Sequence, residues 1–244
     1  GIGIPPIQGG YRSSEDGCNL TFLRTILGAM EILASVSGER RYRDAADEVL
    51  RYWLDHCPYP SGVWPVGEHG VWNFQTDKPD DLRPHEPGAH LDWEALYRIA
   101  PDKVRAEIDM MHRIHVFEYK GLQHHERHGS PKGEPHAVGG CGFIRHSGLF
   151  ARAWAFLYAR TKDPKYLQWA KDQAELCRRL RDPKTGFYPT QSFPPPGETF
   201  GGEQLGPAGA GTLPIWAALG FLDAAEWVDD PAAKQEFYDL GVDM

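Results

Sequence analysis

The chain has 244 residues, of which 41% are hydrophobic and 25% are charged, as is usual for a globular protein. Its formal net charge of −8 is the opposite of the basic footprint of nucleic-acid-binding domains, so we expect no nucleic-acid partner. The sequence holds no apolar run of about 18 residues, and we therefore expect no membrane span. An acidic ligand is still compatible with this charge, because a local group of cations can reverse the field inside a cleft.

Apolar residues recur along the chain with a period of about 3.6, which predicts helices, and no segment alternates convincingly with a period of two. Two helix starts are signalled sharply, because Asp163-Pro164 and Asp230-Pro231 place a capping carboxylate before a proline in the first turn. We predict an all-α chain with helices over residues 20–35, 41–56, 91–99, 101–115, 143–160, 164–180, 213–228 and 231–240.

Apolar residues fall on one face of two predicted helices. In helix 20–35 the face is formed by Leu23, Ile26, Leu27, Met30, Leu33 and Ala34, and in helix 143–160 by Leu149, Phe150, Ala153, Trp154 and Leu157. The four cysteines are widely spaced and lie in or beside different helices, so we expect mostly buried, free thiols rather than disulfides. They are Cys18, Cys57, Cys141 and Cys177.

The chain repeats itself with a period of about 62 residues. The helix starts counted from Arg40, Pro101, Pro164 and Pro231 are 61, 63 and 67 residues apart. In the same register, Gly62-Val63-Trp64-Pro65 returns 124 residues later as Gly186-Phe187-Tyr188-Pro189. A unit of helix, turn, helix and long loop is typical of repeat architectures, in which hairpins stack because one pair cannot bury its apolar face alone. We therefore predict one domain over residues 1–244, with the fold of an (α/α) toroid of six or seven helical hairpins.

The chain is short for a complete toroid of this kind. Six or seven hairpins of this size need roughly 370 residues or more, and 244 residues hold about four of them. We expect a piece of a longer protein, an open array of hairpins, or a ring that closes in another way. A helical solenoid without catalysis is the simplest alternative.

Histidines and carboxylates gather in three of the long loops. Eight of the eleven histidines lie between His69 and His128, and the densest run is His124-His125-Glu126-Arg127-His128-Gly129, which we expect to be a loop. His69, Glu86 and His128 come from successive loops, and two imidazoles with one carboxylate suit a divalent transition metal that also binds substrate. We expect Mn²⁺, Ni²⁺ or a similar ion there, with Ca²⁺ as an alternative.

Further polar and aromatic side chains lie in or beside these loops. Arg145 and His146 begin a predicted helix on the same side, where they could contact a substrate carboxylate or cap a loop. Aromatic residues in the loops could stack on sugar rings or fill the core instead. They are Trp64, Trp72, Tyr119 and Tyr188, of which we select Trp72 and Tyr188 as substrate contacts.

Four of these motifs together resemble the family 2 pectate lyases and their uncharacterised bacterial relatives. The motifs are Glu68-His69-Gly70-x-Trp72, His85-Glu86-Pro87, Trp93-Glu94-x-Leu96 and Arg127-His128-Gly129. The resemblance covers about residues 62–190, and its most specific element is the Arg-His pair. It implies an (α/α) toroid that cleaves polygalacturonate by β-elimination with a divalent transition metal. The chain is about half as long as members of that family, so further residues of the cleft could be absent.

The resemblance also implies roles for single residues. By position, His69, Glu86 and His128 would hold the metal, and Arg127 would be the base that removes the proton from C5 of the sugar. Because guanidinium is normally always charged, Arg127 could instead pair with the uronate carboxylate, and then His124 or His125 would be the base.

We therefore predict a polysaccharide lyase acting on pectate or a related polyuronate, periplasmic or secreted, with a cytoplasmic location as the alternative. A six-hairpin glycoside hydrolase acting on oligosaccharides that contain uronic acid is the main alternative function, and it needs two carboxylates across the scissile bond. A sugar epimerase and a non-catalytic carbohydrate-binding protein are two further alternatives. The carboxylate candidates for a hydrolase are Glu68, Glu86, Asp92, Glu126 and Glu203.

Overall fold

The computed structural model describes residues 17–67, 70–73, 76–79, 85–87, 91–136, 141–195, 197–200, 203–204 and 214–244. These residues form eight α-helices and nine strands of two to four residues, which confirms the predicted all-α class. The helices are α1 (Leu20–Ser37), α2 (Arg40–His56), α3 (Trp93–Ile99), α4 (Pro101–His115), α5 (Ile144–Thr161), α6 (Pro164–Leu180), α7 (Pro214–Trp227) and α8 (Pro231–Asp243).

The strands pair in four small antiparallel sheets. The first sheet has the order β1-β2-β3 and the others are the pairs β4-β5, β6-β7 and β8-β9. Strand bounds are β1 Gly17–Cys18, β2 Trp72–Asn73, β3 Lys78–Pro79, β4 Val116–Tyr119, β5 Leu122–His125, β6 Gly142–Phe143, β7 Gln191–Phe193, β8 Thr199–Phe200 and β9 Glu203–Gln204.

The chain divides into two compact units. The first holds residues 1–110 and 130–134, and the second holds residues 111–129 and 135–244. Helix α4 begins in the first unit and ends in the second. The single domain over residues 1–244 stays a prediction.

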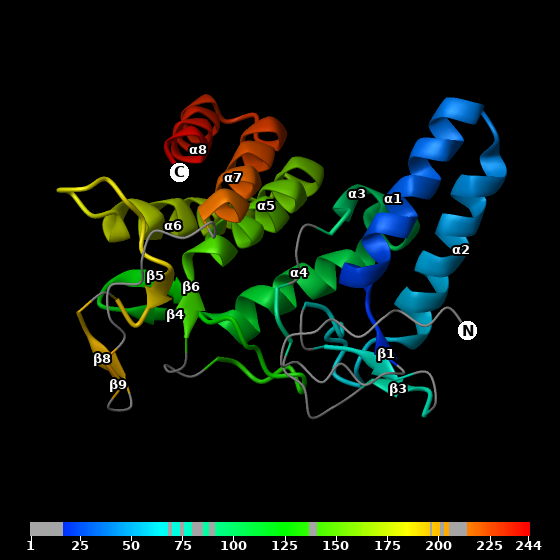
Figure 1. Cartoon of the computed structure of the whole chain (residues 1–244), viewed down its shortest axis with the longest axis horizontal. Helices are drawn as coiled ribbons and strands as arrows, with labels where there is room; N and C mark the ends of the chain where they lie inside the picture. The colour runs from blue at the N-terminus through cyan, green and yellow to red at the C-terminus, as the bar shows by residue number, and fades with distance from the viewer. Residues whose placement is uncertain are drawn as a thin grey trace. The chain divides into compact units, whose positions relative to one another are not determined.

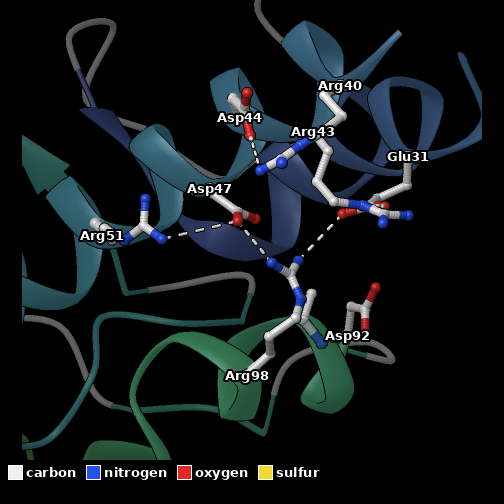
Figure 2. A network of polar contacts seen from close by, with 9 residues as sticks. Glu31, Arg40, Arg43, Asp44, Asp47, Arg51, Asp92 and Arg98 are labelled. Carbon is white, nitrogen blue, oxygen red and sulfur yellow. Dashed lines mark hydrogen bonds and ion pairs between the residues drawn. The ribbon is translucent and has the colours of Figure 1, made fainter. Parts of the chain in front are cut away.

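In the first unit, α1 and α2 form a hairpin, and α3 packs against α2 (Figure 1). The core beside this hairpin is aromatic: the ring of Trp64 lies 5.4 Å from that of Trp53 and 6.3 Å from that of Trp93. An ion-pair network joins the three helices (Figure 2). In it, Arg98 of α3 donates to Asp47 of α2 at 2.6 Å and to Glu31 of α1 at 3.2 Å.

The apolar face of α1 is only partly covered. Ile26 and Leu33 on that face are 52% and 47% exposed, and its remaining members are half-buried. The helix is apolar on most sides, and α2 packs against only part of its circumference. The period of the sequence therefore identified the helix correctly but not the extent of its burial.

The second unit is built around α5, which packs against both α6 and α7, while α7 packs against α8 (Figure 1). All five residues predicted for the inner face of α5 are buried. Helices α5 and α7 cross closely at two glycines. A Cβ on Gly148 would lie 2.1 Å from the carbonyl oxygen of Ala217, and a Cβ on Gly220 would lie 2.3 Å from the backbone of Gly148. Only glycine allows the two backbones to approach this far.

The sequence predicted a loop for the whole run from His124 to Gly129. This prediction is wrong for the first two residues of the run. His124 and His125 end strand β5, which pairs with β4 in a hairpin. The turn between the strands holds Lys120 and Gly121, both with positive φ (51° and 78°), as in the tight turns that suit the twist of a hairpin. Strands of four residues were too short to show an alternating pattern.

The internal repeat has a common local structure at its two aromatic turns. Gly62 and Gly186 both have positive φ (88° and 75°), and Trp64 and Tyr188, two residues later, are both buried. These aromatic positions therefore serve the core in both copies. Three of the predicted free cysteines are confirmed, namely Cys57, Cys141 and Cys177, while the side chain of Cys18 lies outside the described part of the chain.

Candidate functional site

Glu68 and His69 lie outside the described residues, but the residues on either side of this dipeptide are described and tightly held. The Asn19 side-chain amide is fully buried and donates to the carbonyl oxygens of Gly67 at 2.9 Å and of Gly70 at 2.5 Å. Thr21 accepts a hydrogen bond from the backbone N–H of Gly67 at 3.1 Å. The N-terminal turn of α1 therefore fixes both ends of the segment that contains His69.

The loop that carries Glu86 lies directly against this segment. A Cβ on Gly67 would lie 2.5 Å from the carbonyl oxygen of Glu86 and 2.6 Å from its Cβ, and Gly67 has a positive φ of 87°. Glycine is thus required at position 67 both by its conformation and by the approach of Glu86. Glu86 itself is 2% exposed, so its carboxylate is withdrawn from water.

A buried carboxylate of α4 contacts both the segment before Gly67 and the segment of Glu86. Glu107 is 1% exposed, and its Oε1 lies 2.8 Å from Nε2 of His85, the neighbour of Glu86. Its other oxygen accepts from the backbone N–H of Trp64 at 3.1 Å. Sequence reasoning missed both Glu107 and the loop contacts of Asn19, because the partners lie 22 to 51 residues away.

In the second unit, the imidazole of His115 lies close to the residues on both sides of the dipeptide Arg127-His128. The imidazole of His115, at the end of α4, lies 2.7 Å from the carbonyl oxygen of Glu126 through Nδ1. A Cβ on Gly129 would lie 2.8 Å from Nε2 of the same ring. Arg127 donates its backbone N–H to Cys141 at 2.9 Å, and its guanidinium lies 5.0 Å from the centre of the Phe143 ring.

His125 is fully buried, and both of its ring nitrogens lie close to oxygen acceptors, of which the neutral imidazole can donate to only one. Nδ1 lies 2.8 Å from Oε1 of Gln173, and Nε2 lies 2.8 Å from the carbonyl oxygen of Phe143. Burial lowers the pKa of His125 to about 4, so its imidazole is neutral near pH 7. Burial also lowers the pKa of His124, whose Nδ1 lies 3.1 Å from the carbonyl oxygen of Ser192. Both rings are withdrawn from solvent and cross-link β5 to its neighbours.

Arg145 and His146 begin α5, as predicted, but their environments differ. Arg145 is half-buried, and its guanidinium lies 4.6 Å from the centre of the Phe143 ring on which Arg127 also rests. His146 is 1% exposed, and its Nε2 accepts from Nε of Arg145 at 3.1 Å. Burial, followed by the nearby His125 and Arg145, lowers the pKa of His146 well below its usual range. Arg145 is therefore the accessible member of the pair.

Glu126 lies between the buried histidines and Arg127. Its side chain is 15% exposed, and its Oε2 lies 3.2 Å from Nε2 of His136. Burial raises the pKa of this carboxyl from 4.5 to about 7, although the nearby Arg127 opposes the shift. A carboxyl that can hold a proton at neutral pH is suited to act as a general acid.

The two aromatic residues predicted to stack on sugars are almost fully covered. Trp72 lies in β2 and is 5% exposed. Tyr188 is 6% exposed and donates its hydroxyl to Asp243 at 2.7 Å. It borders a cleft of about 820 Å³ between α6 and α8, where Arg181 and Arg178 are already paired with acidic side chains. Neither ring offers a free face for stacking in this structure.

The convergence of the three predicted metal ligands on one ion stays a prediction. His69 lies outside the described residues, while Glu86 belongs to the first unit and His128 to the second. Within the described part of the chain, no group of three or more His, Cys, Asp or Glu side chains converges as a metal site. The donor types themselves fit a divalent transition ion, and the direct packing of Gly67 on Glu86 brings two of the three ligand-bearing segments together.

Comparison with known proteins adds the fold and the family. A solved structure described as an unsaturated glucuronyl hydrolase specific for heparin matches with a TM-score of 0.57 and 14% identity, over 92% of this chain and 60% of that one. This likeness supports the fold alone and confirms the predicted (α/α)-toroid class. The chain thus spans about 60% of the length of the structure that it matches.

None of the helices in the described ranges is both long and apolar enough to cross a membrane. The sequence matches the family described as periplasmic pectate lyase over residues 16–196, which is more than half of the chain and includes every predicted metal ligand. The chain therefore belongs to the periplasmic pectate lyase family.

Proposed function

We propose that this protein cleaves pectate or a related polyuronate by metal-assisted β-elimination, in the periplasm. The observation that carries the proposal is the contact between Gly67 and Glu86, which joins the segment of His69 to that of Glu86. The family match over residues 16–196 supports the same reaction and the same compartment. The structural neighbour's description, which names a glucuronyl hydrolase, is consistent with a uronic-acid substrate.

In the proposed mechanism, His69, Glu86 and His128 would hold a divalent cation such as Mn²⁺ or Ni²⁺. When bound, such a cation neutralises the uronate carboxylate and stabilises the negative charge that develops as the C5 proton leaves. We assign the removal of this proton to Arg127, which is partly exposed. Because a charged guanidinium has no acceptor, Arg127 would have to be in its neutral form to take up the C5 proton. The bond from C4 to the departing glycosidic oxygen then breaks, which leaves an unsaturated sugar.

The Phe143 ring gives Arg127 and Arg145 a shared platform. The two guanidinium groups lie 5.0 and 4.6 Å from the centre of the ring, within the range of cation–π attraction. We propose that Arg145 binds a substrate carboxylate while Arg127 faces C5, because a planar guanidinium matches a carboxylate in shape and charge. Buried His125 and His146 support this platform, so our proposal gives neither of them direct contact with substrate.

Chelation tests the proposed function directly. Protein treated with EDTA and then dialysed should lose activity on polygalacturonate, measured as ultraviolet absorbance of the unsaturated product, and should regain it with added Mn²⁺ or Ni²⁺. The protein should remain folded by circular dichroism throughout. Full activity in the metal-free protein would rule out the metal-assisted mechanism.

A glycoside hydrolase is the second candidate, because the Glu126 carboxyl is largely buried beside His136 and can serve as an acid. A hydrolase would release reducing ends without ultraviolet absorbance. Simultaneous measurement of both signals on the same digest therefore separates the two reactions. In the lyase reaction, the two signals should rise together.

A further inference from the structure

Helices α5 and α7 are joined by two pairs of an arginine and a tryptophan, both within the second unit. Near the start of the two helices, the guanidinium of Arg145 lies 5.5 Å from the centre of the Trp216 ring. Farther along, the guanidinium of Arg152 lies 5.0 Å from the centre of the Trp227 ring. Both tryptophan side chains are half-buried. The two pairs are therefore alike in their own geometry, and they differ in the chemistry around them.

A carboxylate completes the second of these pairs. Nε of Arg152 donates to Oδ2 of Asp223, which also belongs to α7, at 2.6 Å. The Phe156 ring of α5 lies 5.2 Å from the Trp227 ring, edge to face. The positive charge of Arg152 is thus balanced within the helix pair, and Trp227 takes part in a contact that serves the packing of α5 on α7.

The first pair has a second guanidinium beside it. Arg145 lies 4.6 Å from the centre of the Phe143 ring, on which Arg127 also rests at 5.0 Å. Burial raises the pKa of the Cys141 thiol, and Arg127, followed by Arg145, opposes this shift. The carboxyl of Glu126 acts in the same direction as burial. The fields of both guanidinium groups therefore overlap in this place, where they would attract an anionic ligand.

The neighbours of the Arg145 guanidinium fix its orientation. Its Nε donates to Nε2 of His146 at 3.1 Å, and that imidazole is 1% exposed. The Phe143 ring of β6 and the Trp216 ring of α7 contact the same guanidinium. Because Nε is directed at His146, the two terminal nitrogens form the edge at which a carboxylate would bind with two hydrogen bonds.

We propose that Trp216 is a specificity-determining residue, whose ring packs on the apolar C–H face of a uronate residue while Arg145 binds the carboxylate of that sugar. The inference rests on the proposed function, in which Arg145 contacts a substrate carboxylate, but it needs no metal. A half-buried indole suits this role because it offers an apolar face at a surface that is otherwise polar. Trp216 lies in a predicted helix and not in the loops that hold Trp72 and Tyr188, so it was not selected from the sequence.

Trp216→Ala and Trp227→Ala form a matched pair, because each removes a half-buried indole of α7 that contacts an arginine of α5. The probe is trigalacturonate, titrated into the protein by calorimetry in the presence of EDTA. Metal-assisted cleavage then does not contribute to the signal. Circular dichroism checks that both variants are folded, and initial rates on polygalacturonate with Mn²⁺ give KM and kcat for the same proteins.

We expect Trp216→Ala to weaken trigalacturonate binding by about 5- to 10-fold and to raise KM with kcat retained, since the contact contributes binding and no chemistry. Trp227→Ala should bind as the parent does. Parental affinity in folded Trp216→Ala, or an equal loss in both variants, would overturn the role of Trp216. If an alanine variant does not fold, the corresponding leucine variants decide, because leucine keeps apolar bulk but has no flat ring. Parental affinity in Trp216→Leu would then overturn the role.

Arg145→Gln separates this inference from the proposed function. It should weaken trigalacturonate binding by about 10- to 100-fold, because it removes a charged hydrogen-bond donor. Parental affinity in Arg145→Gln would remove the carboxylate contact on which both proposals depend. If the parent cleaves polygalacturonate but Trp216→Ala keeps parental affinity and KM, only the role of Trp216 is overturned. If the parent forms no unsaturated product but loses trigalacturonate affinity in Trp216→Ala, the lyase reaction fails and the role of Trp216 stands.

Discussion

The two units each hold one X-His dipeptide of the predicted site, and they hold it in chemically different ways. In the first unit, the amide of Asn19 binds the residues on either side of Glu68-His69. In the second unit, the imidazole of His115 contacts the residues on either side of Arg127-His128. The amide therefore bonds to both ends of its dipeptide, whereas the imidazole has a polar contact with one end and packs closely on the other.

The side chains around Asn19 in the first unit also differ in chemistry from those around His115 in the second. Beside the first lies a buried carboxylate, Glu107, which joins His85 to the backbone of Trp64. Beside the second lie buried histidines with lowered pKa values, His125 and His146, together with the cations of the Phe143 platform. In the proposed function, the first unit would supply the ligands His69 and Glu86, while the second would supply His128, the base Arg127 and the buried histidines that respond to pH.

The largest effect should come from substitutions that separate metal binding from proton removal. Arg127→Lys keeps a positive charge but loses the planar guanidinium, so turnover should fall by about 10²- to 10⁴-fold, the usual contribution of a general base, with metal affinity retained. Glu86→Gln should lower metal affinity and turnover together. Calorimetry with Mn²⁺ and initial rates on polygalacturonate measure the two quantities. Loss of metal in Arg127→Lys would contradict this assignment of roles.

A matched pair of glycine substitutions should show a difference in rigidity. In Gly70→Ala, the new methyl group would lie 2.7 Å from the backbone nitrogen of Val66 and 2.9 Å from backbone atoms of Pro65, which cannot move aside cheaply. In Gly129→Ala, it would lie 2.7 Å from side-chain atoms of Ile114 and 2.8 Å from Nε2 of His115, and side-chain atoms can shift more easily than backbone atoms. We expect Gly70→Ala to lose about 3 kcal/mol of unfolding free energy and Gly129→Ala about 1 kcal/mol in urea titrations. Equal losses would show that the first loop is no more rigid than the second.

The sequence predicted the helices well because their signals are local. The predicted and observed bounds of α4 agree at both ends, Pro101 and His115, and the Asp-Pro starts of α6 and α8 fall where a carboxylate and a proline cap a helix. Burial was harder to predict, since it depends on the number of neighbours: the periodic pattern of α5 is fully buried and that of α1 is not.

The supports of the site could not be predicted from the sequence, because they join distant positions. The partners of Asn19 lie 48 and 51 residues away, and Gln173, which binds His125, lies 48 residues away. No periodic or spacing rule connects such residues. His125 was predicted as a candidate base because it lies in a polar run of the sequence. Its burial depends on distant partners, and only the fold shows it.

His125 should make the second unit sensitive to acid. Its folded pKa of about 4 lies below the value of 6.5 for an exposed histidine, so the unfolded chain binds more protons between these values and stability is lost as the pH falls from 6.5 toward 4. Between pH 7 and pH 5 this group alone costs about 2 kcal/mol. The raised pKa of Glu126 acts in the opposite direction, contributing stability at low pH that is lost as the pH rises from 4.5 through about 7.

A comparison with His125→Gln isolates the histidine, because Glu126 contributes to both proteins. Urea unfolding at pH 7 and pH 5 should show that the parent loses about 2 kcal/mol more than the variant over this interval. The variant will be less stable than the parent at pH 7, since it loses the contacts to Gln173 and Phe143. Parallel pH profiles for the two proteins would mean that His125 is not the acid-sensitive group.

The smallest effect is expected in the network of Figure 2, which joins α1, α2 and α3 in the first unit. Arg98 binds Asp47, whose side chain is only 10% exposed, so Arg98→Ala leaves a largely buried carboxylate without this partner and should cost about 1 kcal/mol. Arg43 binds Glu31 with more exposed groups, 52% and 26%, so Arg43→Ala should cost a few tenths of a kcal/mol at most. Both losses should shrink in about 1 M NaCl, where charges are screened beyond roughly 3 Å.

Neither variant should change Mn²⁺ affinity, because Asn19, Thr21 and Glu107 hold the segment of His69 without help from this network. A change in metal affinity in Arg98→Ala would show that the helix hairpin, and not the first turn of α1 alone, holds that segment.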